Sequence, residues 1–114
     1  MKKTLTLLII ALFSLSNIFA QNNSTKKADK LFERLEYVKA AQEYLKLAEK
    51  NPDNYIISRL ADAYYNIFNT KEAEKWYAKI INNDPDAEIV FRYSEMLKAN
   101  RKYKESNVWM SKFQ

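Results

Sequence analysis

The sequence has no glycine, no cysteine and no histidine, and only two prolines among its 114 residues. Without glycine it has little of the turn chemistry that β-hairpins use, and its content of Ala, Leu, Lys and Glu favours helices. The missing cysteine and histidine exclude disulfides, thiolate nucleophiles, imidazole bases and the Cys/His metal sites. A chain without cysteine also cannot carry an N-terminal lipid on that residue. We therefore expect a helical chain with no cofactor and no metal.

The formal charge of +5 comes from 19 basic and 14 acidic residues. Lys2 and Lys3 lie in the leader described below, and without them 17 basic residues face 14 acidic ones. The two signs are interspersed along the chain. So mild and mixed a balance is not typical of nucleic-acid-binding proteins, and we expect no nucleic-acid partner.

The first twenty residues have the layout of a secretory signal peptide. Lys2 and Lys3 give a positive start, residues 4–15 are mostly apolar, and Ala20 offers a small residue at the cut. The apolar run is shorter than the ~20 residues that a membrane-spanning helix needs. We expect cleavage before Gln21, with an uncleaved anchor or a buried core helix as the alternatives.

A period of 33 residues organises the rest of the chain, and periods of about 20–50 residues are typical of solenoid folds. Shifting the sequence by 33 aligns small residues with small ones, large with large, and Pro52 with Pro85. The aligned sets are Ala28, Ala61 and Ser94; Leu31, Tyr64 and Leu97; Ala40, Ala73 and Ser106; Tyr44, Tyr77 and Met110; and Leu47, Ile80 and Phe113. These are the small, aromatic and proline positions of a tetratricopeptide repeat, which this sequence resembles.

The resemblance implies an all-α fold, a tetratricopeptide-repeat superhelix (an α-solenoid) of three helix-turn-helix hairpins. Small residues would let the two helices of a hairpin approach closely, and large ones would fill the space between hairpins. The repeats run over about 21–53, 54–86 and 87–114. The expected helices cover about 25–34, 37–50, 54–66, 71–82, 87–99 and 103–113. A plain helical bundle is the alternative.

Signals at the expected helix ends agree with these ranges. Pro52 and Pro85 should end the second helix of the first two hairpins, because proline has no amide donor and disfavours helix before it. Asp53 and Asp86 can then cap the helices that follow. Thr70 has the properties of the cap for the helix over 71–82.

The turn inside each hairpin departs from the repeat pattern. Leu35, Phe68 and Arg101 stand where tetratricopeptide repeats usually have glycine. The aromatic residue before the second helix is missing from the middle unit, which has Thr70 there. We therefore expect the middle turn to differ locally from the other two.

Repeat proteins bind through an extended concave face, which the first helix of each hairpin should line. Asp29, Asp62 and Glu95 occupy one repeat position beside the buried stripe. With the neighbouring side chains, the candidate protein-binding groove consists of Asp29, Phe32, Tyr55, Asp62, Tyr65, Phe91, Glu95 and Lys98. Carboxylates beside rings suit a protein or peptide partner that carries lysine or arginine, and they disfavour one held by its C-terminal carboxylate. A solvated charged face is the alternative.

Two further features concern the second helices. Trp76 and Trp109 are again separated by one full period, and they either pack against the following hairpin or form an outward aromatic ridge. Repeat arrays usually end in a helix with a polar outer face, whereas the last helix here carries Val108, Met110 and Phe113. A following domain, a partner or self-association is expected to cover these side chains.

Three stretches, ADKLFERLEYVKAA (28–41), YNIFNTKEAEKWYA (65–78) and IVFRYSEMLKAN (89–100), resemble the N-terminal region of OmpA-family envelope proteins of Bacteroidota. Those proteins have a signal peptide, a tetratricopeptide segment, a β-propeller-like region and a peptidoglycan-binding domain, and some are associated with type IX secretion. The resemblance implies a scaffold on the periplasmic side of the outer membrane. The peptidoglycan-binding residues belong to the last domain, so none is carried over to this sequence.

We therefore expect a non-enzymatic protein-interaction module of the cell envelope, with no small-molecule substrate. The alternatives are a self-assembling structural component and a part of a type IX secretion-associated complex. An enzyme would need Asp62 and Glu95 as an acid/base pair, and an exposed repeat surface offers no pocket of the kind that such catalysis needs.

Overall fold

The computed structural model describes residues 25–112, and every regular element in that range is a helix. The predicted all-α class is therefore confirmed for this part of the chain, within which no helix is both long and apolar enough to cross a membrane. The predicted signal peptide, Gln21 and Phe113 lie outside the described residues. A first helix over residues 25–33 is followed by α2 (Tyr37–Lys50), α3 (Asn54–Asn66), α4 (Thr70–Ile80), α5 (Ala87–Ala99) and α6 (Tyr103–Ser111).

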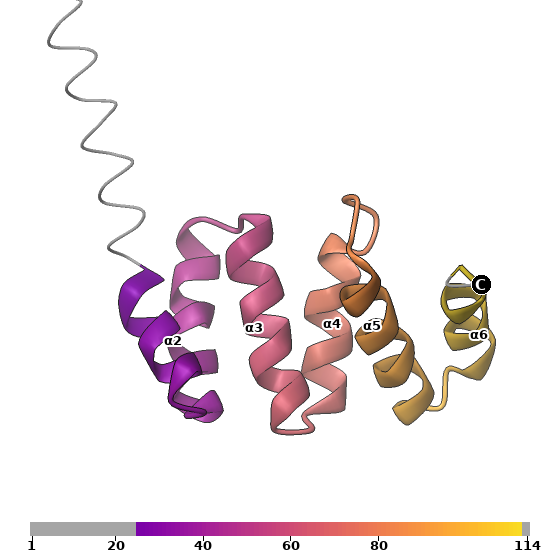
Figure 1. Cartoon of the computed structure of the whole chain (residues 1–114), viewed down its shortest axis with the longest axis horizontal. Helices are drawn as coiled ribbons and strands as arrows, with labels where there is room; N and C mark the ends of the chain where they lie inside the picture. Colours follow the sequence, from indigo (N-terminus) through magenta and orange to yellow (C-terminus); the bar gives the residue numbers. More distant parts are fainter. Residues whose placement is uncertain (1–24, 113–114) are drawn as a thin grey trace, which may run out of the picture.

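The helices lie side by side in an elongated row, in the order of the chain (Figure 1). Helices α2 to α6 pack mainly against their neighbours in the sequence, and α3 also touches α5. The chain reverses direction at every connection, so the turns into α2, α4 and α6 share one edge of the molecule (Figure 1). The described residues thus form three helical hairpins, over 25–50, 54–80 and 87–111.

The small residues of the repeated pattern lie where the helices meet. Ser94 of the third hairpin has no exposed surface, and the buried Ser106 hydroxyl donates to its carbonyl oxygen at 2.8 Å. This bond satisfies a polar group that would be costly to bury alone. The alanines of the first two hairpins are also without exposed surface: Ala28, Ala40, Ala61 and Ala73.

The two tryptophans differ in their surroundings. Trp76 is buried, and its indole Nε1 donates to Glu72 at 3.2 Å, so it takes the packing role rather than the ridge. Trp109 is half-buried and packs edge-on against Tyr93, with ring centroids 5.8 Å apart. In α6 only Ser106 is fully buried, so most of that helix faces outward within the described part of the chain.

The helices that open the second and third hairpins begin after aspartates, as the sequence predicts. Asp53 Oδ1 accepts a hydrogen bond from the Ile56 amide, and Asp86 Oδ1 accepts one from the Ile89 amide, both at 2.8 Å. Each bond satisfies an amide donor that the start of a helix leaves without a backbone partner.

The start of α4 lies one residue earlier than the sequence predicts. Asn69 is the cap, because its side-chain oxygen accepts from the Glu72 amide at 3.4 Å, and Thr70 is already helical. The prediction that Thr70 caps this helix is therefore wrong. The helix also ends at Ile80, two residues before the predicted end.

The three turns inside the hairpins share one backbone conformation. Leu35, Phe68 and Arg101 have positive φ angles of 63°, 56° and 65°. In each turn this residue and the next donate amide hydrogen bonds to carbonyls three and five residues back, which closes the end of the helix. The prediction that the middle turn differs from the other two is therefore wrong for the backbone. The same hydrogen bonds stabilise the left-handed conformation in all three turns, although none of them has glycine.

We predict that replacing Leu35 or Arg101 with glycine raises the free energy of unfolding by about 0.5–1 kcal/mol. A left-handed conformation costs an L-residue about 1–2 kcal/mol, and glycine avoids this cost. Glycine also loses more conformational entropy on folding, which offsets about 0.5–1 kcal/mol of the stabilisation. Both side chains are exposed, so few contacts are lost. Urea unfolding followed by circular dichroism measures the change.

The matched control for this pair is Lys39→Gly, an exposed position inside α2. Glycine should destabilise the protein there by about 1 kcal/mol, since the backbone is right-handed. A loss of stability at Leu35 and Arg101 equal to that at Lys39 would contradict the prediction.

Candidate protein-binding face

A hydrogen bond between two helices recurs at equivalent positions of the first two hairpins. The Tyr44 hydroxyl on α2 donates to Asp29 of the first helix, and the Tyr77 hydroxyl on α4 donates to Asp62 on α3. Both tyrosine side chains are fully buried. Each bond therefore fixes a carboxylate of the first helix against the second helix of the same hairpin.

An arginine of the following hairpin approaches each of these pairs. The Cζ atom of Arg59 on α3 lies 4.5 Å from the centroid of the Phe32 ring, and that of Arg92 on α5 lies 4.9 Å from the centroid of Tyr65. Arg92 Nη1 is also 2.8 Å from Asp62 Oδ1. A cation is attracted both to a ring face and to a carboxylate, so the arginines join neighbouring hairpins.

Two further tyrosine hydroxyls cross between hairpins. Tyr55 on α3 donates to Asp29 Oδ1, and Tyr65 on α3 donates to Glu95 Oε1, both at 2.8 Å. All three carboxylates of the predicted groove, those of Asp29, Asp62 and Glu95, thus accept a hydrogen bond from within the chain. The three carboxylates therefore join helices within a hairpin and join neighbouring hairpins.

The pKa values of the two buried tyrosines are raised above the usual value. For Tyr44 and Tyr77 the larger cause is burial, which disfavours the tyrosinate anion, and the neighbouring aspartate adds to it. The hydroxyls therefore stay protonated, and remain hydrogen-bond donors, over the pH range in which an exposed tyrosine ionises.

The predicted groove residues fall into two groups. Five of them are half-buried: Asp29, Phe32, Asp62, Tyr65 and Glu95. Tyr55 and Phe91 are 46% and 45% exposed, and Lys98 is exposed and forms no ion pair with another described residue. The side chains that a partner would meet first are therefore Tyr55, Phe91 and Lys98.

A hollow of about 530 Å³, here called the α5–α6 hollow, lies where the third hairpin departs from the repeated contacts. Met110 stands there in place of the buried tyrosine. The hollow brings together three of the predicted groove residues with side chains from α6 and from the turn before α4. Its walls include Phe68, Phe91, Glu95, Lys98, Tyr103 and Met110.

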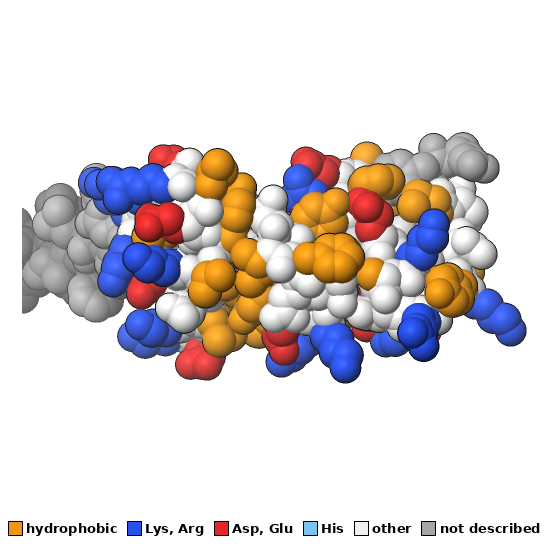
Figure 2. All heavy atoms as spheres, turned by 90° about the horizontal axis from the view of Figure 1, so that it is seen from below, with side chains coloured by type: hydrophobic (Ala, Val, Ile, Leu, Met, Phe, Trp, Pro, Cys, Tyr) orange, Lys and Arg blue, Asp and Glu red, His pale blue; other side chains and the backbone are white. Residues whose placement is uncertain are grey.

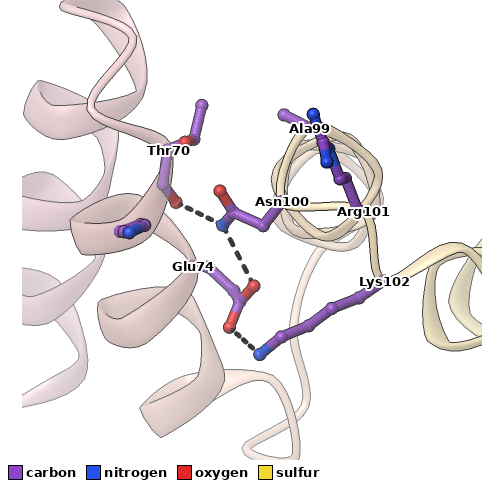
Figure 3. A pocket seen from close by; sticks show the side chains of 7 residues that line it. Thr70, Glu74, Ala99, Asn100, Arg101 and Lys102 are labelled. Atoms are coloured by element: carbon purple, nitrogen blue, oxygen red, sulfur yellow. Dashed lines mark hydrogen bonds and ion pairs between the residues drawn. The ribbon is translucent and has the colours of Figure 1, made fainter.

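A second hollow, of about 550 Å³, lies between the start of α4 and the turn from α5 to α6 (Figure 3). Glu74 accepts from the Asn100 side-chain amide at 3.0 Å and pairs with Lys102 Nζ at 2.7 Å (Figure 3). Asn100 also donates to the Thr70 carbonyl oxygen at 3.0 Å. These polar groups satisfy one another's hydrogen-bonding capacity and join the second hairpin to the third. We therefore assign the residues of the second hollow to a structural contact.

The two arginines that join the hairpins were not among the residues predicted from the sequence. Arg59 and Arg92 are equivalent positions of neighbouring repeats, so the shift that aligned the alanines and tyrosines would have aligned them as well. Their equivalence was the one available signal that the carboxylates beside them have partners inside the chain.

Among residues 25–112, no group of three or more His, Cys, Asp or Glu side chains is placed to hold a metal ion. Comparisons of the chain with protein-family models, with curated proteins and with solved structures found no match. A functional proposal therefore depends on the sequence resemblance and on the contacts described above.

We predict that Tyr77→Phe lowers the free energy of unfolding by about 1.5–3 kcal/mol, the usual contribution of a hydrogen bond to a charged group. The ring and its packing are kept, and only the hydroxyl that Asp62 accepts is lost. The matched control is Tyr37→Phe, because the Tyr37 ring packs on Phe32 while its hydroxyl bonds to no described residue. Urea unfolding that gave equal losses for the two variants would disprove the role of the bond.

We predict that stability falls as the pH rises above ~10, the ordinary pKa of tyrosine. The folded state holds the pKa of Tyr44 and Tyr77 above that value, so the unfolded chain loses protons first. This contribution to stability is complete below the unfolded pKa and is lost progressively above it. Urea midpoints at neutral and alkaline pH measure the loss.

The double variant Tyr44→Phe with Tyr77→Phe serves as the control for this pH dependence. It keeps the lysines that titrate in the same range but lacks the two buried hydroxyls, so its loss of stability with pH should be shallower. A slope equal to that of the unchanged protein would assign the effect to other groups.

Proposed function

We propose that the chain is a non-enzymatic protein–protein interaction scaffold, a tetratricopeptide-repeat superhelix that binds a protein or peptide through the face lined by its first helices. The observation that supports this most is the recurrence of long-range contacts with the period of the sequence. A tyrosine–aspartate bond inside a hairpin and an arginine between hairpins both repeat. Units that repeat their mutual contacts stack into an array, and arrays offer an extended binding surface.

The side chains left on this face support binding rather than catalysis. Tyr55 and Phe91 are 46% and 45% exposed, and exposed aromatic side chains are frequent anchors at protein interfaces. Asp62 accepts from Tyr77 and pairs with Arg92, a setting that favours a structural role over acid/base chemistry. We accordingly propose neither a cofactor nor a small-molecule substrate.

The proposed location is the cell envelope. Residues 1–20 have the layout of a signal peptide, and the repeats resemble the N-terminal region of OmpA-family proteins. The protein would be exported across the inner membrane and would act on the periplasmic side of the outer membrane, as the front end of an OmpA-family protein. A part in a type IX secretion-associated complex would fit the same location.

A self-assembling structural component is the second candidate. Its support is α6, in which only Ser106 is fully buried and Val108 is 57% exposed. Copies could cover this helix by stacking on it. The charges at the ends of the molecule, considered below, oppose such stacking.

The scaffold is tested by capture from an envelope extract of the source cells. We predict that the mature chain, residues 21–114, retains a defined set of envelope proteins, and that the double variant Tyr55→Ser with Phe91→Ser loses them. Both side chains are exposed on first helices and outside the buried core. Because Tyr55→Ser also removes the hydroxyl that Asp29 accepts, circular dichroism and urea unfolding must first show that the variant keeps its fold. Mass spectrometry of the retained proteins measures the result.

The matched control is the double variant Val38→Ser with Val108→Ser, which removes exposed apolar side chains from second helices. It should retain the same proteins as the unchanged chain. Equal capture by both variants would show that the first-helix face is not the binding surface. Capture of no protein by the unchanged chain would contradict the proposed scaffold function. Asp62 and Tyr65 are poorer probes, because both are half-buried and contact Arg92 of the next hairpin.

A further inference from the structure

Each of the first two hairpins has a site that receives an arginine from the next one. The site consists of a carboxylate, a ring three residues later on the same helix, and the hydroxyl of the buried tyrosine. Arg59 lies over Phe32 in the first site. Arg92 lies over Tyr65 and pairs with Asp62 in the second. Both sites are thus filled by the chain itself.

The third hairpin changes every part of this site. Lys98 stands where the ring would be, and Met110 stands where the tyrosine would be. Glu95 has the position of the aspartates, but its carboxylate already accepts the Tyr65 hydroxyl. An arginine placed here would face an ammonium group instead of a ring, and like charges at this range repel. The α5–α6 hollow therefore does not suit the occupant that the first two sites hold.

The walls of the hollow suit a large apolar side chain. Phe68 and Tyr103 are 71% and 56% exposed, and Phe91 of α5 and the half-buried Met110 of α6 also line the hollow. Methionine adapts its shape to a bound group, and aromatic side chains supply contact area at little cost in flexibility. This combination is typical of a surface that accepts an apolar anchor.

The sequence around the hollow is mostly basic, although Glu95 is one of its walls. Between residues 98 and 112 the sequence has five basic residues and one acidic residue, Glu105. Lys102 pairs with Glu74, whereas Lys98 forms no ion pair with a described residue. On the face seen in Figure 2, apolar side chains form a broken band along the molecule, and lysine and arginine side chains, with some acidic ones among them, lie around it, including at both ends. A partner that approaches the α5–α6 end meets positive charge around an apolar centre.

We propose that the α5–α6 hollow binds a segment of a partner protein in which a large apolar side chain stands beside carboxylates. The apolar side chain enters between Phe91, Tyr103 and Met110, and a carboxylate pairs with Lys98. This inference rests on the proposed function and names the partner chemistry for one site. It reverses the sequence-based expectation of a partner rich in lysine or arginine, because the carboxylates that suggested such a partner are engaged internally.

A second copy of the chain is a poor occupant of the hollow. Residues 26–34, at the other end of the row, carry four basic and two acidic residues. One of the two acidic residues, Asp29, already accepts from Tyr44 and Tyr55. End-to-end stacking would therefore bring two basic surfaces together, which electrostatic complementarity disfavours.

The test uses the mature chain, residues 21–114, and three labelled peptides followed by fluorescence anisotropy. The first peptide has phenylalanine and leucine flanked by glutamates, the second replaces the glutamates with lysines, and the third replaces the apolar residues with serines. Only the first should bind, and its binding should weaken as salt is added. Lys98→Glu should weaken it at least about tenfold, and Lys98→Gln should weaken it less.

The matched control is Lys30→Glu, an exposed lysine of the first helix, which should leave the affinity unchanged. Binding of the lysine peptide, binding of no peptide, or unchanged affinity in Lys98→Glu would each overturn the inference. So would sedimentation as a dimer that Phe91→Ser dissolves, since a second copy would then occupy the hollow. If Lys98→Glu still captures the envelope proteins of the earlier experiment, the scaffold stands and only this site fails.

Discussion

The hydrogen bond from a buried tyrosine to an aspartate of the same hairpin is the contact on which the stacked arrangement depends. A half-buried carboxylate is costly unless its oxygens are bonded, and Tyr44 and Tyr77 supply the donors. Tyrosine carries its hydroxyl at the far end of a ring, so one residue fills the core and also reaches the carboxylate. The fixed carboxylate of Asp62 then receives Arg92 from the next hairpin. One interaction thus orders both the hairpin and its neighbour.

The same dependence explains why the third hairpin has a different surface. Methionine at position 110 fills space but donates no hydrogen bond, and Glu95, one methylene longer than aspartate, is reached instead by Tyr65 of the preceding hairpin. The result is an apolar hollow in place of a polar site. In the proposed scaffold, different residues along one repeated face would therefore serve stacking and binding, and the two roles would separate at α5 and α6.

Helix positions could be predicted because their signals are local. Asp53 and Asp86 mark helix starts, and the repeat period places small residues at the contacts. The period also identified equivalent carboxylates, but it could not say which side chain of the next hairpin meets them, since that depends on how the hairpins stack. The turns were predicted less well, because a glycine preference of about 1 kcal/mol is outweighed by the hydrogen bonds that close each helix.

The charge of the sequence is a poor guide to the charge that a partner meets. Every acidic residue counts equally in the formal net charge. The carboxylates of Asp29, Asp62 and Glu95 on the first helices, however, are bound by tyrosine hydroxyls or by Arg92. Asp62 attracts an external cation weakly, because the field of Arg92 cancels much of its own, whereas the tyrosine hydroxyls bonded to Asp29 and Glu95 leave those charges in place. An exposed lysine such as Lys98 keeps its full attraction. In the proposed scaffold, the choice of partner would therefore depend on which charged side chains are left unpaired as well as on the total.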